Sequence, residues 1–142
     1  MVFGKGGSSS RSTKTIDGSN RRFSALIVDD DPIIRRIHTA LLNKHGFETQ
    51  LAENGREALD LFRAGASFDL VLMDRDMPVM DGPQATRELR AMGVTSMIVG
   101  VTTRARDSEK QAFLGAGLNE LHEKPLNAAK VNTLLHELSR NY

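Results

Sequence analysis

The sequence predicts an α/β protein: a five-stranded parallel sheet with helices on both faces. Strand-like and helix-like segments alternate five times between residues 23 and 142, which is typical of parallel strands joined by crossover helices. Most of the predicted strands are short, continuous apolar runs, as expected for strands buried on both faces of a parallel sheet. We therefore place one domain at residues 23–142.

Composition narrows the class of protein. A chain of 142 residues without cysteine suits one domain with no disulfide framework, thiol nucleophile or thiolate metal site. The net charge of +1 combines +4 over residues 1–22 with −3 over the remainder. A basic tail can contact nucleic acid or membrane. Because its basic residues are not interleaved with aromatic ones, we interpret residues 1–22 as a disordered tail rich in Gly and Ser.

The first strand–helix unit has clear boundaries. Residues 25–28 form an apolar, partly β-branched run that predicts a buried strand. Asp31 and Pro32 are typical of the N-cap and first residue of a helix, and Gly46 of its end. The apolar stripe of this helix is predicted to comprise Ile33, Ile34, Ile37, Leu41 and Leu42.

The second unit is weaker. Residues 47–52 alternate between apolar and polar side chains, which favours an edge strand. Asn54 is a suitable cap for the next helix, and Gly65 ends it.

The third strand, residues 70–73, is the most apolar, and Asp74 follows it directly. The turn-forming residues Pro78, Asp81 and Gly82 predict a loop. Pro83 then opens a helix whose inner face should include Leu89 and Met92.

The last two units complete the alternation. Residues 97–101 predict a fourth strand ending at Thr102 and Thr103, and residues 107–116 a short helix containing Phe113. A short strand over residues 119–123 leads into Lys124 and Pro125. The final helix, capped by Asn127, has a predicted stripe of Val131, Leu134, Leu135 and Leu138.

Polar side chains follow four of the five strands. These are Asp29 and Asp30, Asp74, Thr102 and Lys124. Because the carboxyl ends of parallel strands meet at one edge of a sheet, we expect these side chains to converge. Each of them alone also fits an ordinary helix cap, turn residue or solvated surface residue, but the set in this order is not explained that way.

The predicted cluster indicates phosphoryl chemistry. Three neighbouring carboxylates repel one another, and a divalent cation such as Mg²⁺ (or Mn²⁺) removes that conflict. A lysine and a hydroxyl would hold the remaining oxygens of a phosphoryl group. Asp74, at the centre, is the predicted nucleophile.

A family resemblance is carried by six short segments. They are residues 28–32 (VDDDP), 73–74 (MD), 77–78 (MP), 81–82 (DG), 101–102 (VT) and 124–125 (KP). In this combination, over about residues 24–139, the chain resembles the receiver domain of two-component response regulators. The resemblance implies a flavodoxin-like sheet in the order 2-1-3-4-5.

The resemblance also implies roles. Asp74 would accept phosphate from a histidine-containing phosphotransfer protein. Asp30, Asp74 and the backbone carbonyl of Asp76 would bind Mg²⁺, with Asp29 assisting. Thr102 and Lys124 would bind the phosphoryl oxygens.

Residues flanking the phosphoryl site are expected to tune it. Thr103, Asp76 and Arg104 lie beside the expected approach to the phosphoryl group. The latter two are expected to set the rate at which water removes phosphate.

One departure concerns signal output. Receivers commonly carry Phe or Tyr three residues before the lysine, where this chain has Leu121. We also expect no output domain after the last helix. Residues 96–102 (SMIVGVT) and 123–126 (EKPL) are most similar to plant stand-alone receivers of the type-C group. This implies a phosphate sink or phosphohistidine phosphatase in cytokinin-type signalling, and leaves open whether the protein is an enzyme in the ordinary sense.

The remaining expectations are a monomer in the cytoplasm, with the nucleus as a second compartment, that binds neither nucleic acid nor membrane. Two other readings stay open. Asp74 and Asp76 also resemble the Asp-x-Asp pair of haloacid-dehalogenase-like phosphatases, although the acidic pair at 29–30 precedes them and no cap domain is available. The other is an inactive receiver-like binding module.

Overall fold

The computed structural model describes residues 22–141, so the predicted tail of residues 1–22 lies outside them except for Arg22. The guanidinium of Arg22 donates to the carbonyls of Gly46 and Phe47 at 2.9 and 3.2 Å, so Arg22 belongs with the domain and not with the tail. Five strands and five helices alternate along the described chain. The strands are β1 (Ser24–Val28), β2 (Glu48–Ala52), β3 (Leu70–Asp74), β4 (Met97–Thr102) and β5 (Glu120–Glu123). The helices are α1 (Pro32–Lys44), α2 (Gly55–Arg63), α3 (Gly82–Ala91), α4 (Asp107–Gly115) and α5 (Ala128–Arg140).

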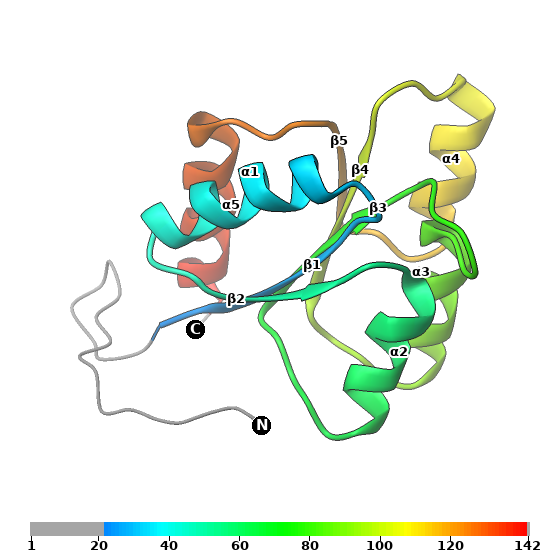
Figure 1. Ribbon diagram of the computed structural model, residues 1–142, viewed down its shortest axis with the longest axis horizontal. Coiled ribbons are helices and arrows are strands. Elements are labelled where there is room, and N and C mark those ends of the chain that lie inside the picture. Colours follow the sequence, from blue (N-terminus) through cyan, green and yellow to red (C-terminus); the bar gives the residue numbers. More distant parts are fainter. Residues whose placement is uncertain (1–21, 142) are drawn as a thin grey trace.

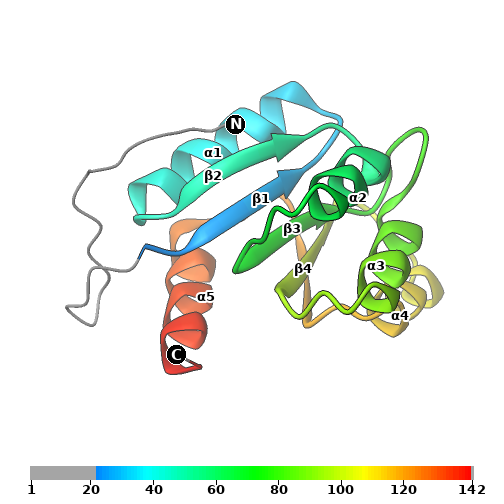
Figure 2. The same ribbon diagram turned by 90° about the horizontal axis from the view of Figure 1, so that it is seen from below.

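The strands form one parallel sheet in the order β2-β1-β3-β4-β5. The predicted fold class is therefore confirmed, including β3 at the centre and the alternating β2 at an edge. Helices α1 and α5 cover one face of the sheet and α2, α3 and α4 the other (Figures 1 and 2). No helix within residues 22–141 combines the length and apolar character needed to cross a bilayer.

Alternating strand residues supply two cores. Ile27 and Leu72 point to the face covered by α1 and α5, whereas Leu26 and Val71 point to the face covered by α2 to α4. Because both faces are covered, β3 is buried at every position, as its continuous apolar sequence requires. Asp74, its last residue, is thereby held at the carboxyl edge of the most buried strand.

The helices begin where the sequence predicts. The side chains of Asp31, Asn54 and Asn127 each accept a hydrogen bond from a backbone N–H in the first turn of α1, α2 and α5, which satisfies donors that the helix leaves unpaired. Asp81 does the same for α3. These caps fix the ends of the loops that leave the carboxyl edge of the sheet.

Helix α1 is rotated relative to the predicted stripe. Ile33 and Ile37 are 64% and 41% exposed, and the fully buried positions are His38 and Leu42. Met92, predicted to be internal, is the C-cap of α3 and is 41% exposed. The predicted stripe of α5 is correct at all four positions.

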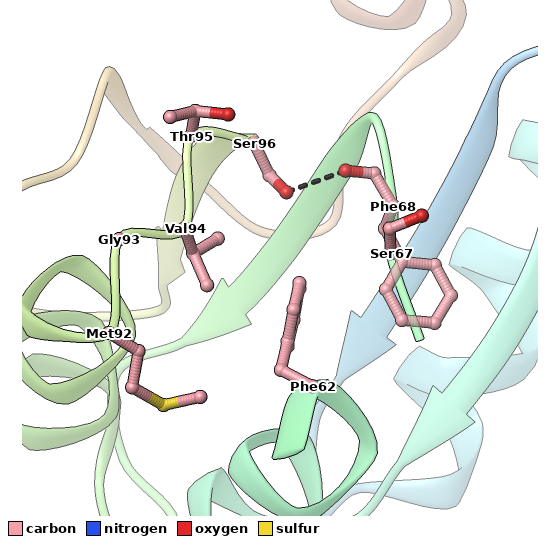
Figure 3. A pocket seen from close by; sticks show the side chains of 8 residues that line it. All are labelled: Phe62, Ser67, Phe68, Met92, Gly93, Val94, Thr95 and Ser96. Carbon is pink, nitrogen blue, oxygen red and sulfur yellow. Dashed lines mark hydrogen bonds between the residues drawn. The ribbon is translucent and has the colours of Figure 1, made fainter. Parts of the chain in front are cut away.

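A hollow of about 310 Å³ lies at the opposite edge of the sheet, between the ends of α2 and α3. Figure 3 shows Phe62 from α2 facing Met92 and Val94, with the Ser96 hydroxyl bonded to the carbonyl of Phe68. The residues that line it carry no titratable group, so the hollow does not share in the chemistry at the carboxyl edge.

One aromatic ring packs helix α4 against the sheet. Phe113 is fully buried, and its ring occupies space that a side chain at Gly100 or Gly82 would need. A Cβ on Gly100 would lie 2.7 Å from Cε2 of Phe113 and 2.5 Å from Cδ1 of Leu118. These two glycines therefore make the slot that holds α4 in place.

We predict that Gly100→Ala destabilises the protein by about 1–3 kcal/mol, because the added methyl overpacks a filled core. The additional change Phe113→Leu should make the Gly100→Ala substitution cost less than it does alone. Gly115→Ala, where a Cβ meets nothing within 4 Å, is the matched control and should be neutral or stabilising. Urea denaturation measures the wild type, Gly100→Ala, Phe113→Leu, the double variant and Gly115→Ala; equal costs of Gly100→Ala in both backgrounds would contradict the slot.

Candidate phosphoryl and metal site

Three aspartates meet at the carboxyl edge of the sheet. Asp29 and Asp30 follow β1, and Asp74 ends β3, which is the neighbour of β1. One carboxylate oxygen from each lies within 4.8 Å of those from the other two. Asp29 and Asp74 are buried, whereas Asp30 is exposed. Such an oxygen cluster fits a hard divalent cation that keeps some of its water.

Lys124 comes from the far end of the chain and joins two of these carboxylates. Its Nζ donates to Oδ2 of Asp29 at 3.1 Å and to Oδ1 of Asp74 at 3.0 Å. Its backbone N–H donates to the carbonyl of Thr102 at 3.0 Å, so that the end of β4 holds the base of the lysine. The four strand ends that the sequence singled out thus come together.

The electrostatics of the cluster are strongly coupled. Burial and, to a smaller extent, the neighbouring Asp29 charge raise the pKa of Asp74 to about 7, against the opposing effect of Lys124. Burial disfavours the charge of Lys124, but its bonds to Asp74 and Asp29 outweigh burial and raise its pKa. The ammonium of Lys124 therefore stays charged, but its single positive charge does not neutralise the surrounding carboxylates.

Two polar atoms of the site lack a partner among residues 22–141. They are Oδ2 of Asp74 and the hydroxyl of Thr102, and both are buried. A buried polar atom without a partner is costly, which suggests a ligand at that position. A carboxylate oxygen without a partner can bind a cation or attack a phosphorus atom, and the hydroxyl can donate to a phosphoryl oxygen.

The remaining predicted residues lie on the surrounding loops. Thr103 and Arg104 are exposed in the loop after β4. Asp76 is exposed as well, and its backbone N–H points to Oδ1 of Asp74 at 3.4 Å. Arg75, which the sequence analysis did not single out, donates to Asp76 at 2.7 Å and contacts Glu109 of α4 at 3.2 Å. In the sequence, only the position of Arg75 next to Asp74 indicates that it belongs to the site.

The loop after β3 has an unusual turn. Val79 has φ of +70°, and the N–H of Met80 donates to the carbonyl of Pro78 at 2.7 Å. This is a γ-turn with a β-branched residue at its centre, which is strained. Its consequence is that the apolar Val79 side chain is 78% exposed five residues after Asp74.

Comparison with known proteins explains this arrangement. The sequence model of the response regulator receiver domain family matches residues 25–136 of this chain. The chain belongs to this family. The response regulator ARR22 of Arabidopsis thaliana is 50% identical over 128 residues, covering 89% of this chain and 90% of the relative. The two-component response regulator 24 of the same plant is 48% identical, covering 83% of this chain and 85% of the relative.

Solved structures of receivers agree with the fold. The receiver domain of the sensor histidine kinase PA1611 of Pseudomonas aeruginosa, with magnesium coordinated in its active-site cleft, matches with a TM-score of 0.73 and 29% identity, covering 83% of this receiver and 98% of that chain. The receiver domain of Saccharomyces cerevisiae Ssk1, bound to the histidine phosphotransfer protein Ypd1, matches with a TM-score of 0.74 and 27% identity, covering 82% and 88%. The resemblance to response regulator receivers is thus confirmed.

The raised pKa of Asp74 predicts how stability depends on pH when no divalent cation is present. The folded receiver holds this proton more tightly than the unfolded chain, in which the pKa of Asp is near its ordinary value of 3.8. Stability contributed by Asp74 is therefore present below pH 3.8 and is lost as the pH rises to about 7.

We expect Asp74→Asn to be more stable than the wild type at pH 8 in EDTA by about 1–2 kcal/mol, because it removes a buried charge that Lys124 only partly compensates. The difference should shrink between pH 7 and pH 4. Urea denaturation at several pH values measures it. A constant difference across that range would show that Asp74 titrates normally.

Proposed function

We propose that this receiver accepts a phosphoryl group from a phosphohistidine onto Asp74. The observation that carries the proposal is the asymmetric environment of this carboxylate. Oδ1 is bonded to Lys124, while Oδ2 is buried and has no partner among residues 22–141. Oδ2 is thus the nucleophile: it would attack phosphorus as the P–N bond breaks and its electron pair returns to the imidazole.

The other strand ends would stabilise the transferred group. Lys124 lies where its ammonium can move from the two carboxylates to a phosphoryl oxygen, and the unpartnered hydroxyl of Thr102 can donate to another. Asp29, Asp30 and Asp74, with the backbone carbonyl of Asp76, would hold Mg²⁺, which supplies the positive charge that the site lacks when bound. The magnesium-bound receiver of Pseudomonas aeruginosa supports this ligand.

We propose a histidine-containing phosphotransfer protein as the donor, on the support of the yeast receiver bound to Ypd1. The donor must bring its phosphohistidine to Asp74 across the surrounding surface. That surface carries three exposed apolar side chains: Ile33 and Ile37 on α1, and Val79 on the strained turn. Apolar side chains close to a reactive centre are suited to a partner's helical face.

We further propose that the protein acts mainly as a phosphate sink in cytokinin-type plant signalling. The similarity to Arabidopsis response regulators of nearly equal length supports this. Leu121, three residues before Lys124, is half-buried against the α2–α4 core and has no ring that could carry a signal to another domain. In this proposal, Asp76 and Arg104 set how fast water removes the phosphate. Family membership favours this function over a haloacid-dehalogenase-like phosphatase.

Incubation with a phosphorylated phosphotransfer protein and Mg²⁺ tests the proposal. Label should move to the wild type as an acid-stable, alkali-labile acyl phosphate and then appear as free phosphate, so that the donor is drained. Asp74→Asn should take up less than about 1% of the label, because an amide is a poor nucleophile. Undiminished labelling of this variant would place the acceptor elsewhere, and no labelling of the wild type would indicate an inactive binding module.

The docking surface is tested separately from the chemistry. The double change Ile33→Glu and Ile37→Glu should slow transfer from the phosphotransfer protein by roughly tenfold or more, as for loss of a central apolar contact. Phosphorylation by the small donor acetyl phosphate should stay unchanged, since Asp74 is untouched. Met92→Glu, with the same 41% exposure as Ile37 but at the opposite edge of the sheet, is the matched control. Equal slowing with both donors would contradict docking on α1.

A further inference from the structure

A buried histidine connects α1 to the loop that carries Lys124. His38 is 1% exposed, and its Nε2 accepts a hydrogen bond of 3.0 Å from the backbone N–H of Leu126. This bond joins residues 88 positions apart in the chain. Leu126 lies two residues after Lys124, in the loop between β5 and α5.

The geometry defines the form of the imidazole. Because Nε2 accepts from an N–H group, it carries a lone pair, so the ring is neutral and its proton lies on Nδ1. Burial lowers the pKa of His38, the Asp29 charge raises it and the Lys124 charge lowers it; the net lowering favours the neutral ring.

The buried imidazole has a cost as well as a function. Nδ1 is buried and has no partner among residues 22–141. An unpaired buried donor costs about 1–3 kcal/mol, and an aliphatic side chain at this core position would avoid it. The feature that an aliphatic residue could not supply is the acceptor for Leu126.

Lys124 is consequently fixed by backbone bonds on both sides. Its own N–H donates to Thr102 of β4, and the N–H of Leu126 donates to His38 of α1. Helix α1 starts directly after Asp29–Asp31. One helix therefore supports both partners of the ion pair, the carboxylate of Asp29 at its start and, through His38, the loop of Lys124.

We propose that His38 is a positioning residue for phosphoryl binding: it holds the β5–α5 loop so that the Lys124 ammonium lies at Asp74. This inference rests on the proposed function, because it assigns His38 to the lysine that would bind phosphoryl oxygens. The proposal predicts that His38 affects the binding of two ligands at this site differently. Mg²⁺ would contact the aspartates, whereas a phosphoryl group would also need Lys124 in place.

Two variants test the role of the acceptor atom. His38→Leu fills the space without an acceptor, and His38→Gln places Oε1 near the position of Nε2. Mg²⁺ affinity is measured alone, and beryllofluoride affinity, as a phosphoryl mimic, is measured at saturating Mg²⁺. His38→Leu should weaken beryllofluoride binding by roughly tenfold, because the displaced Lys124 ammonium would lose its hydrogen bond to the mimic, and a hydrogen bond to a charged group has about that effect. It should leave Mg²⁺ affinity within about twofold, and His38→Gln should restore most of the beryllofluoride affinity.

A control separates this role from general loss of stability. Leu42→Ala empties a buried position one turn further along α1 and should lower the free energy of unfolding without changing either affinity. The inference would be overturned if His38→Leu bound beryllofluoride as the wild type does, or if both ligands weakened equally. Failure of the wild type itself to bind beryllofluoride would instead overturn the proposed function.

If His38→Leu does not fold, the wild type alone still tests the geometry. Nitrogen-15 NMR of the imidazole should show the Nδ1–H form and a coupling across the hydrogen bond between Nε2 of His38 and the amide nitrogen of Leu126. The Nε2–H form would overturn the inference, because that nitrogen could not accept the bond.

Discussion

Carboxylates held close together at one edge of a sheet repel one another, and the rest of this structure is arranged around that repulsion. Asp29 and Asp74 are buried, so water screens them poorly. The described chain supplies one ammonium to both of them, from Lys124, at 3.1 and 3.0 Å. One positive charge does not balance three carboxylates, so a bound divalent cation would stabilise the site.

This balance depends on parts of the fold that are far apart in the sequence. β1, β3 and β4 bring the acids and Thr102 together because they are adjacent in the sheet. Lys124 reaches the acids from an edge strand, and its position relies on Thr102 and His38. On the acidic side, the N–H of Asp31 donates to Asp29 at 2.9 Å, and Arg35 donates to the Asp29 carbonyl at 2.7 Å. Helix α1 therefore orders both halves of the site.

The sequence predicts well those features that depend on residues close together in the chain, and less well those that depend on tertiary packing. Caps, strand ends and the apolar run of β3 are local, and they predicted a parallel sheet and which residues converge at its carboxyl edge, whereas the strand order came from the resemblance to receivers. The stripe of α1 depends on how the helix lies on the sheet, which is not local. Ranking side chains by apolarity selected Ile33 and Ile37 for the core, whereas packing buried His38, whose acceptor for Leu126 lies 88 residues away in the chain. The role of Arg75 was missed for the same reason, since its partner Glu109 lies on α4.

The same packing bears on what phosphorylation would do to the rest of the molecule. The ring of Phe113 lies against Gly82 and Gly100, and Gly82 in turn lies against the carbonyl of Asp74. Arg75 adds an ion pair between the loop after β3 and the start of α4. Helix α4 is thus held to β3 by a filled slot and a charge contact, and close-packed cores resist small shifts. With Leu121 in place of a movable ring, this structure favours chemistry at Asp74 over a rearrangement of α4, which is the behaviour that a phosphate sink requires.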